Sequence, residues 1–134
     1  MIFLDSWTFI EYFSEKENNA AENLIENAKN RVISSAVLLE IKYRIAKLFG
    51  LEHANNIVYI IENLDIDIMP VTSEVASLAA DLRLKYYDKK TRDLSFIDAI
   101  NLATAILTGC EKFYTGDPDF KGIEEIKIEN IRKA

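Results

Sequence analysis

Residues 94–105 read LSFIDAINLATA, and they place an acidic residue, Asp98, beside the apolar stripe of a predicted helix. If that helix begins near Ser95, one of its faces has the 3.6-residue period of a buried stripe, made by Phe96, Ile97, Ile100, Ala103, Thr104 and Leu107. Ser95 and Asp98 fit a capping box, and an acid in the first turn suits the helix dipole. Asp98 is therefore either a structural cap or an acid that the fold delivers to a functional site.

Composition sets the first bounds on the protein. The chain has 134 residues, 49% of them hydrophobic, which predicts a single domain over residues 1–134 with a substantial core. The only cysteine, Cys110, excludes an internal disulfide and a multi-cysteine zinc site, and we expect it to be buried in a protein of a reducing compartment. No stretch approaches the ~18 apolar residues of a membrane span, so we expect a cytoplasmic protein. The net charge of −6 argues against nucleic-acid binding through overall basicity.

Strand-like and helix-like segments alternate along the chain. Short apolar runs predict strands at Ile2–Leu4, Arg31–Ser34, Ile66–Val71, Lys112–Thr115 and Ile126–Ile128. Helical periodicity and caps predict helices at Trp7–Phe13, Asn19–Lys29, Ala36–Phe49, Leu51–Leu64 and from Thr72 or Ser73 to Tyr86, before the helix that begins near Ser95. This order predicts an α/β fold of three layers, α/β/α, around a mainly parallel sheet of four to five short strands.

Four acids are expected at one edge of that sheet. Asp5 and Asp117 each follow a predicted strand, and sites of open parallel sheets form outside the carboxyl ends of the strands. Helices that follow such strands begin at the same edge, which brings Asp98 and Glu40 towards it. Each acid also has a simpler explanation: Asp5 as a helix cap, Glu40 as the partner of Arg44 in a surface ion pair, Asp98 as a capping-box residue and Asp117 as a turn former.

The convergence of four acids has chemical consequences. Two carboxylates about 4 Å apart repel each other by roughly 4 kcal/mol at an effective dielectric of about 20, so four together need protons or cations. Oxygen ligands suit Mg²⁺ or Mn²⁺, and a site of this kind serves phosphoryl transfer. RNA cleavage by a histidine pair is excluded, because the only histidine, His53, lies in a predicted helix, where we expect a structural or surface role.

The chain resembles PIN-domain ribonucleases, and among them the small toxins of the VapC type. Four segments carry the resemblance: IFLDSWTFI from Ile2, ISSAVLLEI ending at Ile41, LSFIDAINLATA from Leu94 and FYTGDPDF from Phe113. The resemblance implies that the metal-binding and catalytic acids are Asp5, Glu40, Asp98 and Asp117, with Asp119 as a further metal-binding acid and with Ser6 and Thr115 as supporting hydroxyl residues. Trp7, which is bulkier than the residue often found there, and the polar Asn101 depart from the pattern.

The resemblance also implies an activity and partners. It predicts a Mg²⁺- or Mn²⁺-dependent endoribonuclease that uses a metal-activated water and leaves a 5′-phosphate. A cognate antitoxin would fill the groove near the acids with its C-terminal segment, and the toxin would form a homodimer. RNA phosphates would be held by basic residues near the site, at Lys42, Arg44, Lys47, Arg83, Lys85, Lys89, Lys90 and Arg92, although acids interrupt this set and a solvated helix end explains the last five equally well.

Two other classes of function fit part of the pattern. A signalling receiver domain also carries acids and magnesium at a sheet edge, but it needs paired acids after the first strand, where this chain has Asp5 followed by Ser6. A catalytically silent scaffold that binds RNA or protein would keep the fold without the activity. Metal-dependent stabilisation separates an acidic metal site from such a scaffold, because the ions bind only the folded arrangement.

Overall fold

The fold is built on a sheet of five parallel strands. The computed structural model describes residues 1–133, and the strands in that range are β1 (Ile2–Leu4), β2 (Arg31–Ser34), β3 (Ile66–Met69), β4 (Lys112–Thr115) and β5 (Lys127–Asn130). They lie in the order β3-β2-β1-β4-β5, and every neighbouring pair is parallel. All carboxyl ends therefore meet at one edge.

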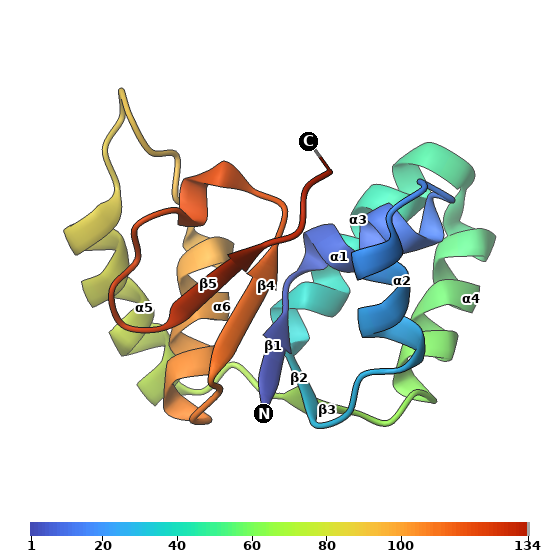
Figure 1. Ribbon diagram of the computed structural model, residues 1–134, viewed down its shortest axis with the longest axis horizontal. Helices are drawn as coiled ribbons and strands as arrows, with labels where there is room; N and C mark the ends of the chain where they lie inside the picture. The colour runs from blue at the N-terminus through green and yellow to red at the C-terminus, as the bar shows by residue number, and fades with distance from the viewer. Residues whose placement is uncertain (134) are drawn as a thin grey trace.

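Helices cover both faces of this sheet. They are α1 (Ser6–Phe13), α2 (Asn19–Glu26), α3 (Ser35–Phe49), α4 (Leu51–Glu62), α5 (Ser73–Tyr86) and α6 (Phe96–Leu107), followed by a short 3₁₀ helix, η1 (Pro118–Phe120). Helices α5 and α6 lie on one side of the sheet and α1 to α4 on the other (Figure 1). The predicted three-layer α/β/α fold is confirmed.

Aromatic packing joins the two central strands. Phe3 of β1 and Phe113 of β4 stack with ring centroids 5.0 Å apart, and Phe120 of η1 lies 4.7 Å from Phe113. All three side chains are fully buried, and each such burial contributes about 1.5–3 kcal/mol. The pairing continues past β1, where the backbone N–H of Asp5 donates to the carbonyl of Tyr114. This packing sets Asp5 beside the end of β4.

Local sequence chemistry fixes where several helices begin. The side chains of Asn18, Ser34, Thr72 and Ser95 each accept a backbone N–H from the first turn of the helix that follows. At Ser95 the reciprocal bond from the Asp98 carboxylate is also made, so the predicted capping box is confirmed. Because α6 runs back across the sheet, its capped end lies at the carboxyl edge of the strands.

Several predicted boundaries and buried positions were wrong. The strand that begins at Ile66 ends at Met69 instead of Val71, because Pro70 has no N–H for the sheet ladder. The second helix ends at Glu26, short of Lys29, and the expected turn after Gly116 contains η1. Phe96, the first residue of α6, is 70% exposed, and Leu48 and Leu107 are exposed near the ends of their helices. Fewer residues of the chain pack against the ends of a helix, so apolar residues there are more exposed than those in its middle.

Two other expectations concern single residues. Cys110 is buried as expected. His53 lies exposed on α4 with its ring 5.4 Å from that of Phe49, which agrees with a structural or surface role. No helix within residues 1–133 is long and apolar enough to span a membrane.

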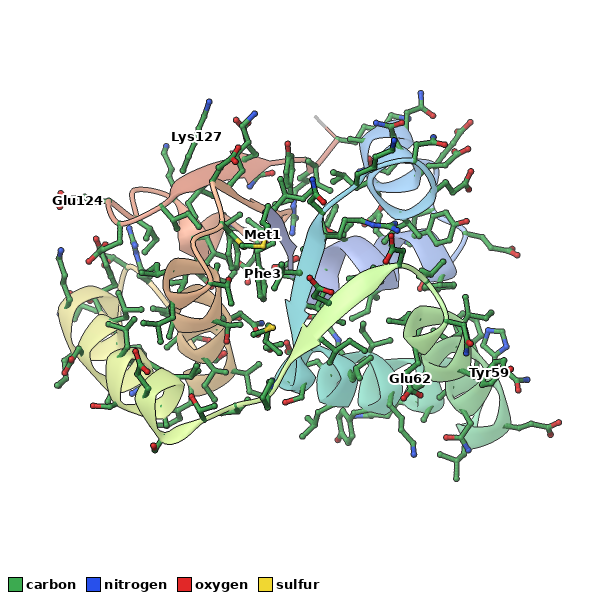
Figure 2. All side chains as sticks on the ribbon, turned by 90° about the horizontal axis from the view of Figure 1, so that it is seen from below. Met1, Phe3, Tyr59, Glu62, Glu124 and Lys127 are labelled. Carbon is green, nitrogen blue, oxygen red and sulfur yellow. The ribbon has the colours of Figure 1, made fainter. Side chains whose placement is uncertain are left out.

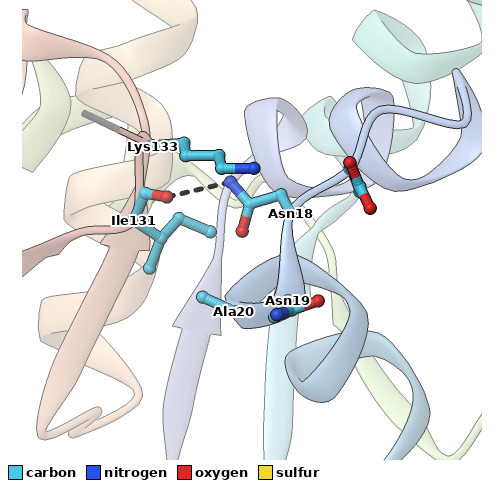
Figure 3. A pocket seen from close by; sticks show the side chains of 6 residues that line it. Asn18, Asn19, Ala20, Ile131 and Lys133 are labelled. Carbon is cyan, nitrogen blue, oxygen red and sulfur yellow. Dashed lines mark hydrogen bonds between the residues drawn. The ribbon is translucent and has the colours of Figure 1, made fainter.

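The C-terminal segment is tied back to the body of the protein. The side-chain amide of Asn18, before α2, donates to the carbonyl of Ile131 at 2.9 Å, and Lys133 lies beside the same hollow (Figure 3). The N–H of Ile131 in turn donates to the carbonyl of Thr115. These bonds hold the segment after β5 against the carboxyl edge of β4.

Candidate functional site

The site is built around Asp5, a buried acid at the end of β1. Only 4% of Asp5 is exposed, and its Oδ2 accepts a 2.6 Å hydrogen bond from the hydroxyl of Thr115 at the end of β4. Its other oxygen, Oδ1, is buried with no hydrogen-bond partner in the described part of the chain. The pKa of Asp5 is raised to about 8. Burial is the largest cause, the negative charges of Asp98 and Glu40 add to it, and the hydroxyl of Thr115 and the backbone of Thr8 act in the opposite direction.

A chain of hydrogen bonds continues from Thr115 through the next two acids. The Thr115 hydroxyl accepts the backbone N–H of Asp117 at 3.0 Å, and Asp117 Oδ1 accepts the N–H of Asp119 at 2.8 Å. Asp119 accepts the N–H of Asp93 at 3.4 Å. Partial burial and the charge of Asp117 both raise the pKa of Asp119. The turn after β4 thus presents two acids in a fixed relation to Asp5.

Glu40 joins the site through Ser6. The Ser6 hydroxyl, buried at the start of α1, donates to Glu40 Oε1 at 2.9 Å, which links α1 to α3. None of the ion pairs within residues 1–133 joins Glu40 to Arg44, so the surface pair suggested by their spacing is wrong. Glu40 instead faces Asp5 and Asp98 closely enough to raise the pKa values of both.

Asp98 is at once a helix cap and a member of this group. Its N–H donates to Ser95 Oγ at 3.0 Å, and its Oδ2 accepts the N–H of Ser95 at 3.2 Å. The pKa of Asp98 is raised to about 7. Burial is the largest cause, the charges of Asp117 and Glu40 add to it, and the bonds with Ser95 act in the opposite direction. The two interpretations of Asp98 are therefore compatible, because the capped end of α6 faces the other acids.

The acids approach one another without forming a closed ligand cage. Among the described residues, no group of three or more His, Cys, Asp or Glu side chains lies close enough to hold a metal ion as placed. The chemistry of the set nevertheless fits a hard cation: the donors are all oxygens, and Asp5 Oδ1 is buried without a partner. Raised pKa values at Asp5 and Asp98 show that the site opposes further negative charge. A cation bound among these acids would relieve that opposition.

The predicted RNA-binding cations fall into two sets. Three are held by the protein itself: Lys85 pairs with Glu124 and Glu125, Arg92 donates to the carbonyl of Lys121, and Arg83 donates to the carbonyl of Leu94. The guanidinium carbon of Arg83 also lies 4.1 Å from the ring centroids of both Tyr87 and Phe96. Arg83 therefore covers part of the exposed Phe96 ring. No ion pair within residues 1–133 involves the other five, Lys42, Arg44, Lys47, Lys89 and Lys90.

Sequence reasoning missed two residues beside the acids, Gly116 and Arg132. Gly116 precedes Asp117, and its backbone lies against the indole of Trp7. Arg132 Nε donates to the carbonyl of Gly116 at 2.7 Å. A glycine directly after a strand was an available sign of close approach, whereas nothing in the charged C-terminal sequence distinguishes Arg132 from its neighbours.

The chain matches one protein family and is similar in fold to several solved structures. The family model of the PIN domain matches residues 2–126. A search of curated proteins gave no significant match. Three solved structures are similar in fold. The Salmonella typhimurium VapBC bound to DNA has 22% identity and a TM-score of 0.78, and the alignment covers 98% of each chain. Mycobacterium tuberculosis VapC20, described as a sarcin-ricin loop cleaving toxin, has 21% identity and a TM-score of 0.76 over 95% of this chain and 99% of that one. A toxin-antitoxin complex from Klebsiella pneumoniae has 23% identity and a TM-score of 0.73 over 100% of both chains.

The family match spans both central strands, the buried acid after β1 and the capped end of α6. The structural likeness, at these identities, concerns the fold, and that fold has the same layers as the one described above. Together with the acids at the carboxyl edge, the family match establishes that this chain belongs to the PIN domain family.

Proposed function

We propose that this chain, as a single PIN domain over residues 1–134, is a Mg²⁺- or Mn²⁺-dependent endoribonuclease and the toxin of a VapBC-type pair. The observation that carries the proposal is the buried Asp5 carboxylate, whose Oδ1 has no hydrogen-bond partner within residues 1–133. Asp98 and Glu40 lie close enough to raise its pKa, and Asp117 acts on Asp98 in the same way. A buried carboxylate oxygen without a donor is costly unless a cation or proton compensates it. A metal-dependent nuclease would bind such a cation at this site.

Each residue has a defined part in this proposal. Asp5, Glu40, Asp98 and Asp117 would hold the metal, and Asp119 would join from the turn after β4. Thr115 orients Asp5 through its 2.6 Å hydrogen bond, and Ser6 orients Glu40 at 2.9 Å. Mg²⁺ or Mn²⁺ bound there supplies neutralisation of charge, polarisation of the scissile phosphate and a lowered pKa for the attacking water. The fixed hydroxyl contacts reduce the reorganisation that catalysis would otherwise require.

The proposed partners are RNA and an antitoxin protein. One structurally similar protein is described as a toxin-antitoxin complex, another as VapBC bound to DNA, and VapC20 is described as a toxin that cleaves the sarcin-ricin loop. On this chain a hollow of about 610 Å³ lies between the end of α1 and helix α4, with Tyr12, Phe13, Phe49 and Ile60 among its lining residues. Its apolar groups suit a further segment of the antitoxin. None of the four acids lines this hollow, so it is separate from the groove near the acids that is expected to take the antitoxin's C-terminal segment. A homodimer in the cytoplasm completes the proposal.

The central test is the substitution Asp98→Asn. An asparagine oxygen can still accept the N–H of Ser95, so the cap persists while the charge is lost. We expect RNA cleavage to fall by at least about 10²-fold, as expected when a metal-binding or charge-stabilising group is removed, with the melting temperature close to that of the wild type. The matched control is Asp88→Asn, in the connection before α6, which should cleave normally. Full activity of Asp98→Asn would refute the assignment.

A further inference from the structure

Trp7 occupies a fixed position beside the acids. It follows Ser6, whose hydroxyl binds Glu40, and it lies against Gly116, which precedes Asp117. A Cβ atom on Gly116 would lie only 2.2–2.4 Å from three ring atoms of Trp7. The indole therefore touches the backbone of Gly116 directly, and only glycine leaves room for it.

A cation from the C-terminal segment holds the same ring. The guanidinium carbon of Arg132 lies 5.6 Å from the centroid of Trp7, within the range of a cation–π contact. Arg132 Nε also donates to the carbonyl of Gly116 at 2.7 Å. The segment that carries Arg132 is anchored by the bond from Asn18 to Ile131. Trp7 is thus positioned from two elements distant in the sequence.

Part of the indole remains open to a hollow of about 110 Å³. The hollow is lined by Trp7, Ile10, Glu11, Ser14, Lys16 and Arg44. Lys16 and Arg44 are exposed, and neither takes part in an ion pair between residues 1 and 133. The hydroxyl oxygen of Ser14 is buried and lacks a partner in the same range. The hollow offers an aromatic surface and two cations against the single acid Glu11.

We propose that this hollow is a nucleotide subsite in which an RNA base beside the scissile phosphate stacks on Trp7. The proposal deepens the proposed ribonuclease function and rests on it. A flat aromatic surface binds any unstacked base, and cations beside it bind the flanking phosphates. Lys16 and Arg44 supply those cations. The site adjoins this hollow along the chain, because Trp7 follows Ser6, whose hydroxyl donates to Glu40, and Gly116 precedes Asp117.

A reporter is already present, because Trp7 is the only tryptophan. We would titrate the wild-type protein with a single-stranded oligoribonucleotide in EDTA, which prevents metal-dependent cleavage, and follow tryptophan fluorescence. Stacking predicts saturable quenching of Trp7. Inorganic polyphosphate carries charge without bases, so it should bind without comparable quenching. Equal quenching by polyphosphate would overturn the subsite.

Matched variants separate stacking from general charge. Trp7→Leu should weaken binding of a dye-labelled oligoribonucleotide by roughly tenfold, as measured by anisotropy, while Trp7→Phe should retain part of the affinity. Tyr59→Leu removes an aromatic residue of α4 that is 69% exposed (Figure 2) and does not line the hollow, so it should have no effect. The double variant Lys16→Ala, Arg44→Ala should also weaken binding, whereas Lys29→Ala, Lys127→Ala should not.

The outcomes distinguish this inference from the proposed function. If wild-type protein cleaves RNA in Mn²⁺ but binds the oligoribonucleotide without fluorescence change, the subsite is wrong and the nuclease function stands. If quenching and the Trp7→Leu effect are seen without cleavage, the subsite stands and the nuclease assignment fails. Unchanged affinity of both Trp7 variants, with melting temperatures near that of the wild type, would overturn the subsite.

Discussion

Asp5 carries an unusual electrostatic load for a single carboxyl group. Burial and the facing charges of Asp98 and Glu40 raise its pKa from 3.8 to about 8. A group whose pKa is higher in the folded state binds protons more tightly there, so its contribution to stability is fully present below pH 4. That contribution is lost as the pH rises from about 4 to about 8.

We therefore expect the metal-free protein to lose stability between pH 5 and pH 8, by an amount on the order of a few kcal/mol. Asp5→Asn cannot ionise and should reduce this dependence, with the remaining part due to Asp98, whose pKa is raised to about 7. The buried amide removes some stability at every pH. Urea unfolding in EDTA at several pH values measures both. The control is the exposed acid Asp67→Asn, which should keep the wild-type slope, and an unchanged slope in Asp5→Asn would contradict the account.

Thr115 is the second residue whose role can be tested alone. Its hydroxyl donates to Asp5 and accepts from the N–H of Asp117, so Thr115→Val leaves two buried polar groups without a partner. We expect a loss of about 1–3 kcal/mol in the free energy of unfolding. The pKa of Asp5 should rise further, so the acidic limb of the pH–rate profile should move to higher pH, because protons compete with the metal.

Thr115→Ser is the matched variant, because it keeps the hydroxyl and loses only a methyl group. It should retain most of the activity and the position of the acidic limb. If the serine and valine variants behave alike, the hydroxyl does not position Asp5, and the effect of either substitution is one of packing.

At the scale of elements, the position of α6 depends on a buried polar pair. The Ser34 hydroxyl, at the start of α3, donates to Asn101 of α6 at 2.6 Å, and both residues are buried. Asn101 lies one turn after Asp98, whereas Ser34 precedes the helix that carries Glu40. The pair therefore fixes the two helices that bring acids to the site. Asn101, the polar residue that departs from the family pattern, thus has Ser34 as its hydrogen-bond partner.

Removing this pair should affect both stability and catalysis. Asn101→Ala leaves the Ser34 hydroxyl without its acceptor in a buried place, and we expect a loss of about 1–3 kcal/mol by urea unfolding. Activity measured well below the melting temperature should also fall, because Asp98 is held less rigidly relative to Glu40. Asn55→Ala, on the exposed face of α4, is the control. A destabilised but fully active Asn101→Ala would show that the pair supports the fold alone.

In the whole molecule, folding brings the four acids together, and the electrostatic repulsion between them lowers stability. A bound cation offsets that repulsion. A ligand that binds only the folded state stabilises it by about 2.7 kcal/mol at a concentration 100 times its Kd. We expect Mg²⁺ or Mn²⁺ to raise the melting temperature of the wild type by several degrees. The double variant Asp5→Asn, Asp98→Asn should lose this response. Equal stabilisation of both proteins would mean that the ions bind elsewhere.

Local patterns determined much of this protein from the sequence alone. The apolar runs predicted five strands, and helical periodicity predicted the helices, with Ser95 and either Thr72 or Ser73 as expected caps. These predictions hold because strand and helix periods and capping bonds involve near neighbours. Parallel order then predicted that Asp5 and Asp117 would share one edge of the sheet. The predicted burial of residues near helix ends, such as Phe96, was wrong. The helical period shows which residues share a face, but not how far the neighbouring layer covers that face.

Only the tertiary structure decided how the acids are held. Glu40 bonds to Ser6, 34 positions away, instead of Arg44 on its own helix, and Asp5 bonds to Thr115 across 110 positions. The contact of Trp7 with Gly116 and Arg132 likewise joins both ends of the chain. Strand register and the packing of the layers determine these partners. The spacing of residues along a single helix or strand carries no information about either.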